Sequence, residues 1–148
     1  RYVESLVAAI KSRLQPIALE VLHRHREAGD RVVVATGAPP ELARAILAFV
    51  AHEDVPVVGT EVGPRLGGVG PTRHCHNEEK MRMLRERGYG NIDIAYSDST
   101  ADLPLLLAAK APVVVNPKAA RVAMFRRVLP PGTPILNWGC KDRGGTAA

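Results

Sequence analysis

The chain has 148 residues, of which 46% are hydrophobic and 4% are aromatic, and its formal net charge is +5. This length suits one domain with a buried core, and a composition of small aliphatic rather than aromatic residues favours helices packed on a sheet over a β-sandwich. The basic residues are interspersed with acidic ones and have no aromatic residues between them for base stacking, which argues against nucleic acid binding.

Helix and strand signals alternate along the chain. The predicted helices cover residues 1–14, 16–28, 39–49, 78–87, 101–109 and 119–128. The predicted strands cover residues 32–35, 55–62, 92–96, 113–115 and 135–136, with a glycine-rich loop over residues 63–70. Asn77 is the expected N-cap of its helix and Gly88 the expected stop. This regular alternation predicts an α/β fold with a parallel sheet and helices on both faces.

Sequence signals for export are missing. The chain has no apolar run of the roughly 18 residues that a membrane span needs, and no secretory signal segment opens it. Its two cysteines, Cys75 and Cys140, are too few for a disulfide framework. We therefore expect a cytoplasmic protein without membrane or nucleic acid partners, and we make no prediction of its oligomeric state.

Polar residues follow three of the apolar runs, where ligands bind in an open parallel sheet. They are Thr36 and Gly37, Ser97 and Asp98, and Asn116. A hydroxyl and a free amide before a helix can bind an anion, although they can also simply form a turn. Asp98 and the nearby Asp102 can hold a divalent cation or favour a helix N-terminus, and both interpretations stay open for the pair alone.

Three further features have two interpretations each. Lys80 opens a helix, where it opposes the helix dipole; it is either a solvated surface lysine or part of a charged site together with the hydroxyl of Thr36 and the carboxylates. The run His74-Cys75-His76 has metal-ligating side chains, but adjacent residues rarely converge on one ion, so a loop leading to the Lys80 helix fits better. Arg73 can reach a phosphate or only solvent. Trp138 and Cys140 are expected to pack against the last strand.

In combination, these residues resemble the haloacid dehalogenase superfamily, and within it the phosphoserine-phosphatase-like branch. Residues 32–37 look like the family's second motif, residues 76–80 like its third and residues 95–104 like its fourth. The resemblance runs from about residue 14 to residue 136. It implies a Rossmann-like core over residues 15–140, the end of a helical cap or a linker over residues 1–14, and a flexible tail over residues 141–148.

The resemblance also implies a role for each matching residue. Thr36 and Gly37 would bind the transferred phosphoryl group, and Lys80 would balance its charge. Asp98 would be a ligand of Mg²⁺, and Asp102 would support Lys80. Position 97 is serine where many relatives have glycine.

The family's first motif is missing. It consists of two aspartates one residue apart and supplies the nucleophile, but no two of the six aspartates here have that spacing. The strand that carries it is also the centre of the family's sheet, so its loss would leave unpaired backbone groups at about 1 to 3 kcal/mol each. We therefore expect these residues to be part of a longer protein, inactive and poorly folded alone.

The leading functional hypothesis is the carboxyl-terminal part of a magnesium-dependent phosphomonoester hydrolase. It would act through an aspartyl phosphate on a small phosphorylated substrate such as phosphoserine. The alternative is a non-catalytic phosphate-binding or interaction module that keeps the fold without the nucleophile. A receiver-like signalling domain has the same doubly wound pattern, but it needs an acidic cluster at its first strand, which this sequence does not show.

Overall fold

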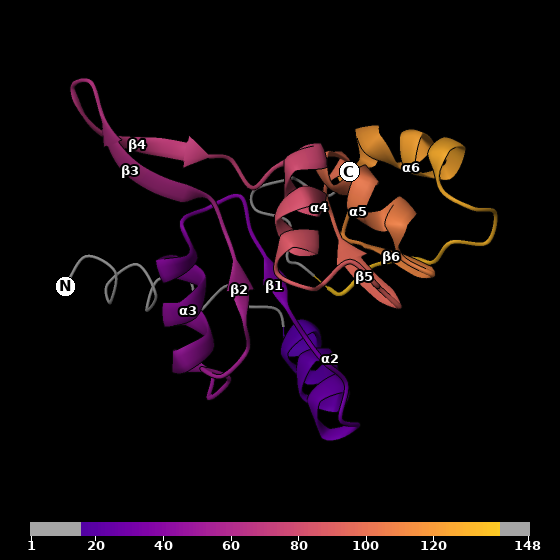
Figure 1. Ribbon diagram of the computed structural model, residues 1–148. Helices are drawn as coiled ribbons and strands as arrows, with labels where there is room; N and C mark the ends of the chain where they lie inside the picture. The colour runs from indigo at the N-terminus through magenta and orange to yellow at the C-terminus, as the bar shows by residue number, and fades with distance from the viewer. Residues whose placement is uncertain (1–15, 140–148) are drawn as a thin grey trace, which may run out of the picture.

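The computed structural model describes residues 16–139. The predicted helix over residues 1–14 and the predicted tail over residues 141–148 lie outside the described residues. The elements are α2 (Pro16–Glu27), β1 (Val34–Ala35), α3 (Pro40–Phe49), β2 (Val57–Val58), β3 (Glu61–Arg65), β4 (Gly68–Arg73), α4 (Asn77–Glu86), β5 (Ile94–Ser97), η1 (Thr100–Asp102), α5 (Leu103–Ala108), β6 (Ala111–Val115), η2 (Ala119–Arg121), α6 (Val122–Val128) and β7 (Ile135–Leu136), where η marks a 3₁₀ helix (Figure 1).

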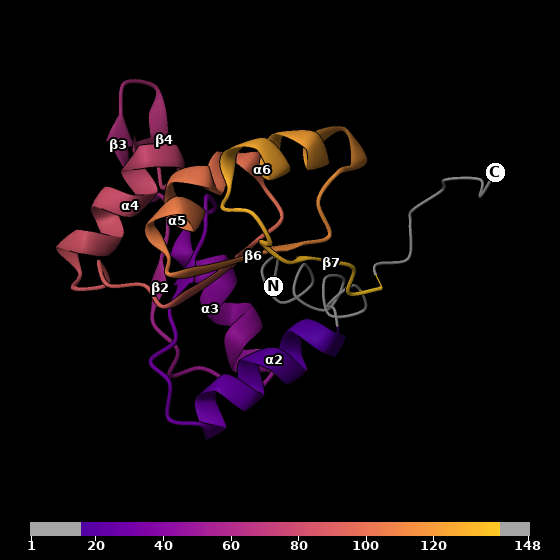
Figure 2. The same cartoon turned by 90° about the vertical axis from the view of Figure 1, so that its right-hand side faces the viewer.

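Helices cover the strands on two sides. In Figure 2 the helices α4, α5 and α6 lie above β6 and β7, whereas α2 and α3 lie below them. The strands between these helices pair in parallel: β1 with β2, β5 with β6, and β6 with β7. The α/β, Rossmann-like fold class is therefore confirmed. No helix among the described residues is long and apolar enough to cross a membrane.

The parallel strands form two separate sheets rather than one. One sheet has the order β1-β2 and the other the order β5-β6-β7. Within residues 16–139, β1 therefore has a partner only on the side of β2, and β5 only on the side of β6. This separation agrees with the gap that the missing central strand was predicted to leave.

The segment predicted as a glycine-rich loop is instead a β-hairpin. Antiparallel β3 and β4 pair from Glu61 with Arg73 to Arg65 with Gly68, and the hairpin projects away from the helices (Figure 1). The prediction was wrong because glycine weakens the strand signal, although a partner strand can still hold it extended. Gly67 has a φ of +92° in the connecting turn, which glycine adopts without strain.

Two helix starts also differ from the prediction. The N-cap of α4 is His76, which makes no side-chain cap bond, and Asn77 is already the first helical residue. The predicted Asn77 cap is therefore wrong by one position, whereas Gly88, with a φ of +84°, does end the helix. The predicted helix over residues 101–109 begins with a 3₁₀ turn, because the Ser99 side chain accepts the Ala101 N–H there.

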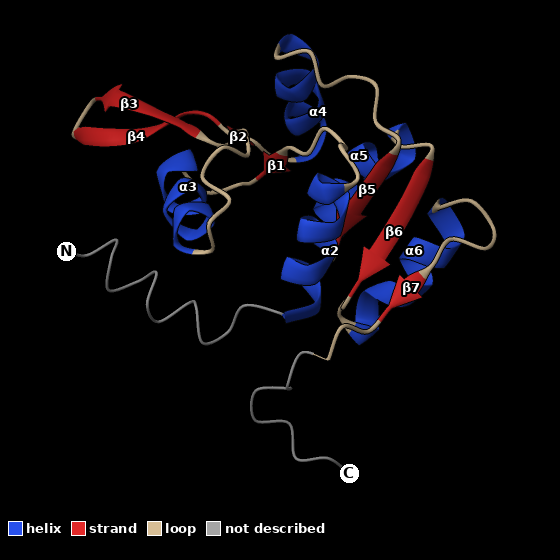
Figure 3. Cartoon of the chain, turned by 90° about the horizontal axis from the view of Figure 1, so that it is seen from below, coloured by secondary structure: helices blue, strands red, loops and turns tan. Residues whose placement is uncertain are grey.

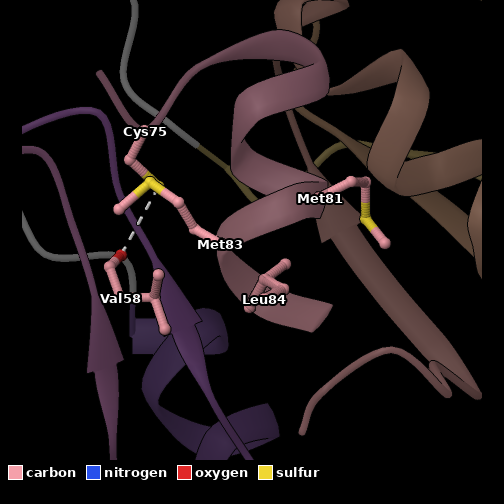
Figure 4. Packing of buried hydrophobic residues seen from close by; sticks show 5 residues of the cluster. All are labelled: Val58, Cys75, Met81, Met83 and Leu84. Carbon is pink, nitrogen blue, oxygen red and sulfur yellow. Dashed lines mark hydrogen bonds between the residues drawn. The ribbon is translucent and has the colours of Figure 1, made fainter. Parts of the chain in front are cut away.

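A buried cluster joins the two sheets. It consists of Val58, Cys75, Met81, Met83 and Leu84, and Figure 4 shows the Cys75 sulfur facing the Val58 carbonyl. Residues next to both sheets pack against this cluster: Val33 and Ala35 at β1, Ile92 just before β5, and Leu105 of α5. Helix α4, which carries three of the five buried residues, therefore holds the β1 side and the β5 side together.

Candidate active site

Thr36 and Gly37 form a tight turn directly after β1. The Thr36 N–H donates to Val58 O at 2.9 Å, and Thr36 Oγ1 accepts the Ala38 N–H at 3.1 Å. The hydroxyl therefore shapes the turn itself and does not cap α3, whose N-cap is Pro39. Because its oxygen accepts from Ala38, the hydroxyl proton stays available to donate to an anion.

Thr60 fastens this turn to the segment before α4. Its buried hydroxyl donates to Gly37 O at 2.6 Å and accepts the Cys75 N–H at 3.0 Å. Gly59 permits the close approach, because a Cβ there would lie 2.8 Å from Ala38 O. The sequence analysis did not predict a role for Thr60. The one feature that could have indicated it was a hydroxyl residue within a predicted apolar strand.

Lys80 and Asp102 form a buried ion pair. Lys80 Nζ lies 2.5 Å from Asp102 Oδ1, and the two side chains are only 7% and 14% exposed. Lys80 lies on the same buried side of α4 as Met81, Met83 and Leu84, which explains why a lysine in the first helical turn points inward. The structure thus brings together two residues that the sequence had suggested as partners.

Ser97 holds the other oxygen of Asp102. The buried Ser97 hydroxyl donates to Asp102 Oδ2 at 2.6 Å and accepts the Ser99 N–H at 3.1 Å. Both carboxylate oxygens of Asp102 are therefore bound by protein donors. Ser97 was noted in the sequence only as a departure from the usual glycine, so its contact with Asp102 was missed.

Asp98 differs from Asp102 in having no partner among the residues that the structure describes. Asp98 is exposed, and no described residue forms a hydrogen bond or an ion pair with its carboxylate. It follows β5 immediately, at the carboxyl end of the strand. Among residues 16–139, no group of three or more His, Cys, Asp or Glu side chains could hold a metal ion.

Cys75 connects the Thr36 turn with the Lys80–Asp102 pair. Burial raises the pKa of its thiol, while the nearby Lys80 ammonium acts in the opposite direction and the Asp102 carboxylate adds to the rise. The Thr36 backbone also lowers the pKa of this thiol. The geometric link to the turn is Thr60, which bonds both Gly37 O and the Cys75 N–H, so Cys75 lies between the Thr36–Gly37 turn and the helix that carries Lys80.

The other candidates have structural contacts. His74 and His76 are exposed on either side of buried Cys75, so the three side chains do not converge. The Asn116 side chain accepts the Trp138 N–H at 2.7 Å. Arg73 binds Glu79 and, through both terminal nitrogens, Glu86 at 2.5 and 2.8 Å. These contacts raise the pKa of Arg73 and lower the pKa of Glu86, and they fasten β4 along α4.

Comparison with known proteins agrees with this architecture. A crystal structure of a protein of unknown function from Bordetella pertussis Tohama I is similar in fold, with a TM-score of 0.69 and 18% identity over 93% of this chain and 67% of that chain. No curated protein matches the sequence. The model of the family described as haloacid dehalogenase-like hydrolase matches residues 1–107. Because this match spans more than half of the chain, the chain belongs to the haloacid dehalogenase-like hydrolase family.

Proposed function

We propose that this chain supplies the phosphate-binding and metal-binding part of a magnesium-dependent phosphomonoester hydrolase of the phosphoserine-phosphatase-like branch. The observation that carries the proposal is the buried Lys80–Asp102 pair, whose lysine lies on the helix that follows Cys75, the residue that Thr60 ties to the Thr36–Gly37 turn. The substrate would be a small cytoplasmic phosphomonoester such as phosphoserine. Family membership supports a hydrolase, and the site residues support phosphate as the group it acts on.

Lys80 is suited to hold a phosphoryl group. An ammonium has three N–H donors, and among the described residues only Asp102 accepts from Nζ. Asp102 fixes the direction of the lysine, so the remaining donors can point at phosphoryl oxygens without reorganisation. The Thr36 hydroxyl and the Gly37 amide would donate to the same group.

Asp98 fits Mg²⁺ better than Asp102 does. Magnesium prefers hard oxygen ligands and is usually bound through one or two carboxylates, with water and substrate phosphate completing its coordination. Within residues 16–139 nothing binds the carboxylate of Asp98, whereas both oxygens of Asp102 are bound by Lys80 and Ser97. Bound there, the cation would neutralise charge on the phosphoryl group.

The nucleophile of the proposed reaction lies outside these 148 residues. The described aspartates other than Asp98 are paired with a basic side chain: Asp30 with His25, Asp54 with Arg26, Asp93 with Lys110 and Asp102 with Lys80. An aspartate from elsewhere would attack phosphorus, and water would then hydrolyse the acyl phosphate. In this scheme the residues described here bind, orient and neutralise the phosphoryl group.

Binding of inorganic phosphate tests the proposal without requiring turnover. Calorimetric titration of the 148-residue chain should show phosphate binding that becomes about tenfold tighter with Mg²⁺. Asp98→Asn should remove the Mg²⁺ effect. Asp93→Asn is the matched control, because it neutralises an exposed aspartate at the opposite end of β5 and should leave the effect intact.

The same titration separates the two candidate functions. Phosphate binding that ignores Mg²⁺ would favour the non-catalytic phosphate-binding module, which the missing nucleophile also suits. Absence of phosphate binding by a chain that shows a cooperative urea transition, and is therefore folded, would contradict both. An effect of Mg²⁺ that persists in Asp98→Asn would show that the cation is held elsewhere and would contradict the role given to Asp98.

A further inference from the structure

The β3–β4 hairpin has an exposed apolar face. Its register places four apolar side chains on the same face, and all four residues are exposed: Val62, Pro64, Val69 and Pro71. Leu66, in the turn at the tip, is fully exposed, and Val69 beside it is 79% exposed. A contiguous apolar surface of this kind usually marks a contact site.

The hairpin is not suited to binding by strand addition. Pro64 on β3 and Pro71 on β4 have no backbone N–H, so neither edge offers another strand a continuous ladder. The base of the hairpin is fixed, because Arg73 at the end of β4 binds Glu86 of α4 through both terminal nitrogens. A partner would therefore contact the side chains of the apolar face and the tip.

A second surface feature is a stretch of chain without acidic residues. Between positions 103 and 139 there is no aspartate or glutamate, but there are five basic residues. Four of these residues lie on or beside η2 and α6, and all four are exposed: Lys118, Arg121, Arg126 and Arg127. None of them forms an ion pair with a residue that the structure describes. We call these four residues the basic patch.

The hairpin tip and the basic patch lie at the same end of the molecule. Both are at the top in Figures 1 and 2, which share a vertical axis. In the view from below they lie on opposite sides of α4 and α5 (Figure 3). Phe125 of α6 is buried in the core, so Arg127, about 200° further around the helix, points away from the core. A flat surface at this end of the molecule can therefore touch both features.

A lipid bilayer fits this arrangement better than a protein partner does. Its headgroups present anions over a plane, and the layer below them accepts aliphatic side chains without a shaped pocket. A stable protein contact needs about 800 Å² of complementary surface on each partner, whereas the apolar face is small and lies apart from the basic patch. The expected absence of a membrane partner rested on the lack of a spanning segment, and a protein can bind a membrane surface without one.

We propose that the chain binds anionic lipid membranes with this end. Leu66 and Val69 enter the acyl layer, and the basic patch lies on the headgroups. An apolar anchor or a few basic residues alone bind membranes weakly, so the two features act together. This binding needs neither the nucleophile nor Mg²⁺, so it stands or falls separately from the proposed function.

Sedimentation with lipid vesicles tests the proposal on the 148-residue chain. Vesicles of phosphatidylcholine with one-third phosphatidylserine should bind the chain saturably. Vesicles of phosphatidylcholine alone should bind it at least about tenfold more weakly, because they lack the negative surface potential. A salt concentration of about 1 M NaCl should also weaken binding to the anionic vesicles, because it screens charges beyond about 3 Å.

Two variant pairs test the tip and the basic patch separately. Leu66→Ser should weaken vesicle binding by about tenfold, whereas Ile17→Ser, a similar change at an exposed position of α2 at the opposite end, should not. Arg127→Gln should weaken binding by about fivefold. Arg24→Gln should not, although it also removes an exposed arginine without an ion pair among the described residues. All four changes are at the surface, so a parent-like urea midpoint is expected for each variant.

Three results would overturn the proposal. The first is no saturable binding of the chain to anionic vesicles. The second is an equal loss of binding in the control variants, which would show that net charge or folding, not this end of the molecule, decides the affinity. The third is parent-like binding of Leu66→Ser together with equally tight binding of polyglutamate, which would indicate an acidic protein as the partner of the basic patch.

Discussion

Two lysine–aspartate pairs flank β5 and differ mainly in their exposure. At the carboxyl end, Lys80 and Asp102 are 2.5 Å apart, and their side chains are 7% and 14% exposed. At the amino end, Lys110 and Asp93 are 3.1 Å apart, and their side chains are 75% and 81% exposed. The residue types are identical, so the comparison isolates the effect of surroundings on one kind of ion pair.

The difference shows why only one pair is suited to a site. Water and salt screen the charges of the exposed pair, so separating its two side chains changes the free energy of unfolding only slightly. The buried pair has given up most of its hydration, so each charge depends on the donors or acceptors that the protein supplies. A lysine in such surroundings keeps a fixed direction, which is what recognition of a phosphoryl group requires.

The largest expected effect comes from breaking the buried pair. Lys80→Met keeps most of the side-chain volume but leaves the Asp102 carboxylate with Ser97 as its remaining side-chain donor. The free energy of unfolding should fall by about 3–5 kcal/mol, measured by urea denaturation. Lys110→Met is the matched control and should cost less than about 1 kcal/mol. Similar decreases in the free energy of unfolding of the two variants would show that burial does not make the two ion pairs differ in strength.

A smaller effect is expected from the serine that supports Asp102. Ser97→Ala removes a hydrogen bond to a buried carboxylate and should lower the free energy of unfolding by about 1–3 kcal/mol. In an Asp102→Asn background, Ser97→Ala should lower the free energy of unfolding by a smaller amount, because the charged acceptor is gone. Equal costs in both backgrounds, again from urea denaturation, would mean that Ser97 acts independently of Asp102.

Much of this site could be predicted from the order of its parts. The apolar runs at β1 and β5 end in polar residues, and parallel strands bring such ends to one edge, which is how Thr36 and Asp98 were chosen. The pairing of Lys80 with Asp102 was expected from the resemblance to the haloacid dehalogenase superfamily. Helices α2 and α6 were also predictable, because Pro16 starts one and apolar spacing defines the other. These features depend on local chemistry or on a general rule of sheet geometry.

The parts that escaped prediction depend on contacts between distant residues. Nothing in a serine after an apolar run indicates that its hydroxyl will meet Asp102, and nothing in Thr60 indicates that it will bridge Gly37 and Cys75. The hairpin of β3 and β4 was missed because pairing, not propensity, keeps its glycines extended. Whether the chain is inactive and poorly folded alone stays a prediction.

A third ion pair has intermediate exposure and should respond to acid. Arg73 and Glu86 are 27% and 52% exposed, and Arg73 lowers the pKa of Glu86 below its unfolded value. The unfolded chain therefore binds more protons in acid, so this stabilisation is present above pH about 4.3 and is lost as the pH falls through the folded pKa.

The variant Glu86→Gln tests this sign. The free energy of unfolding, measured by urea denaturation between about pH 6 and pH 3, should fall less steeply with acid than in the parent chain. Glu53→Gln is the control, because it removes an exposed glutamate whose carboxylate has no partner among the described residues. A parent-like slope in Glu86→Gln would contradict the assigned interaction with Arg73.

The smallest effect is expected at the amino end of β5. Asp93→Asn should change the free energy of unfolding by less than about 1 kcal/mol, and 1 M salt should remove most of that change, because the exposed charges are screened within about 3 Å. A loss that is larger or resistant to salt would show that the Lys110–Asp93 pair is desolvated, contrary to its exposure. It would also disqualify Asp93→Asn as the control for Asp98→Asn, since that comparison requires a carboxylate next to β5 whose removal leaves the fold unchanged.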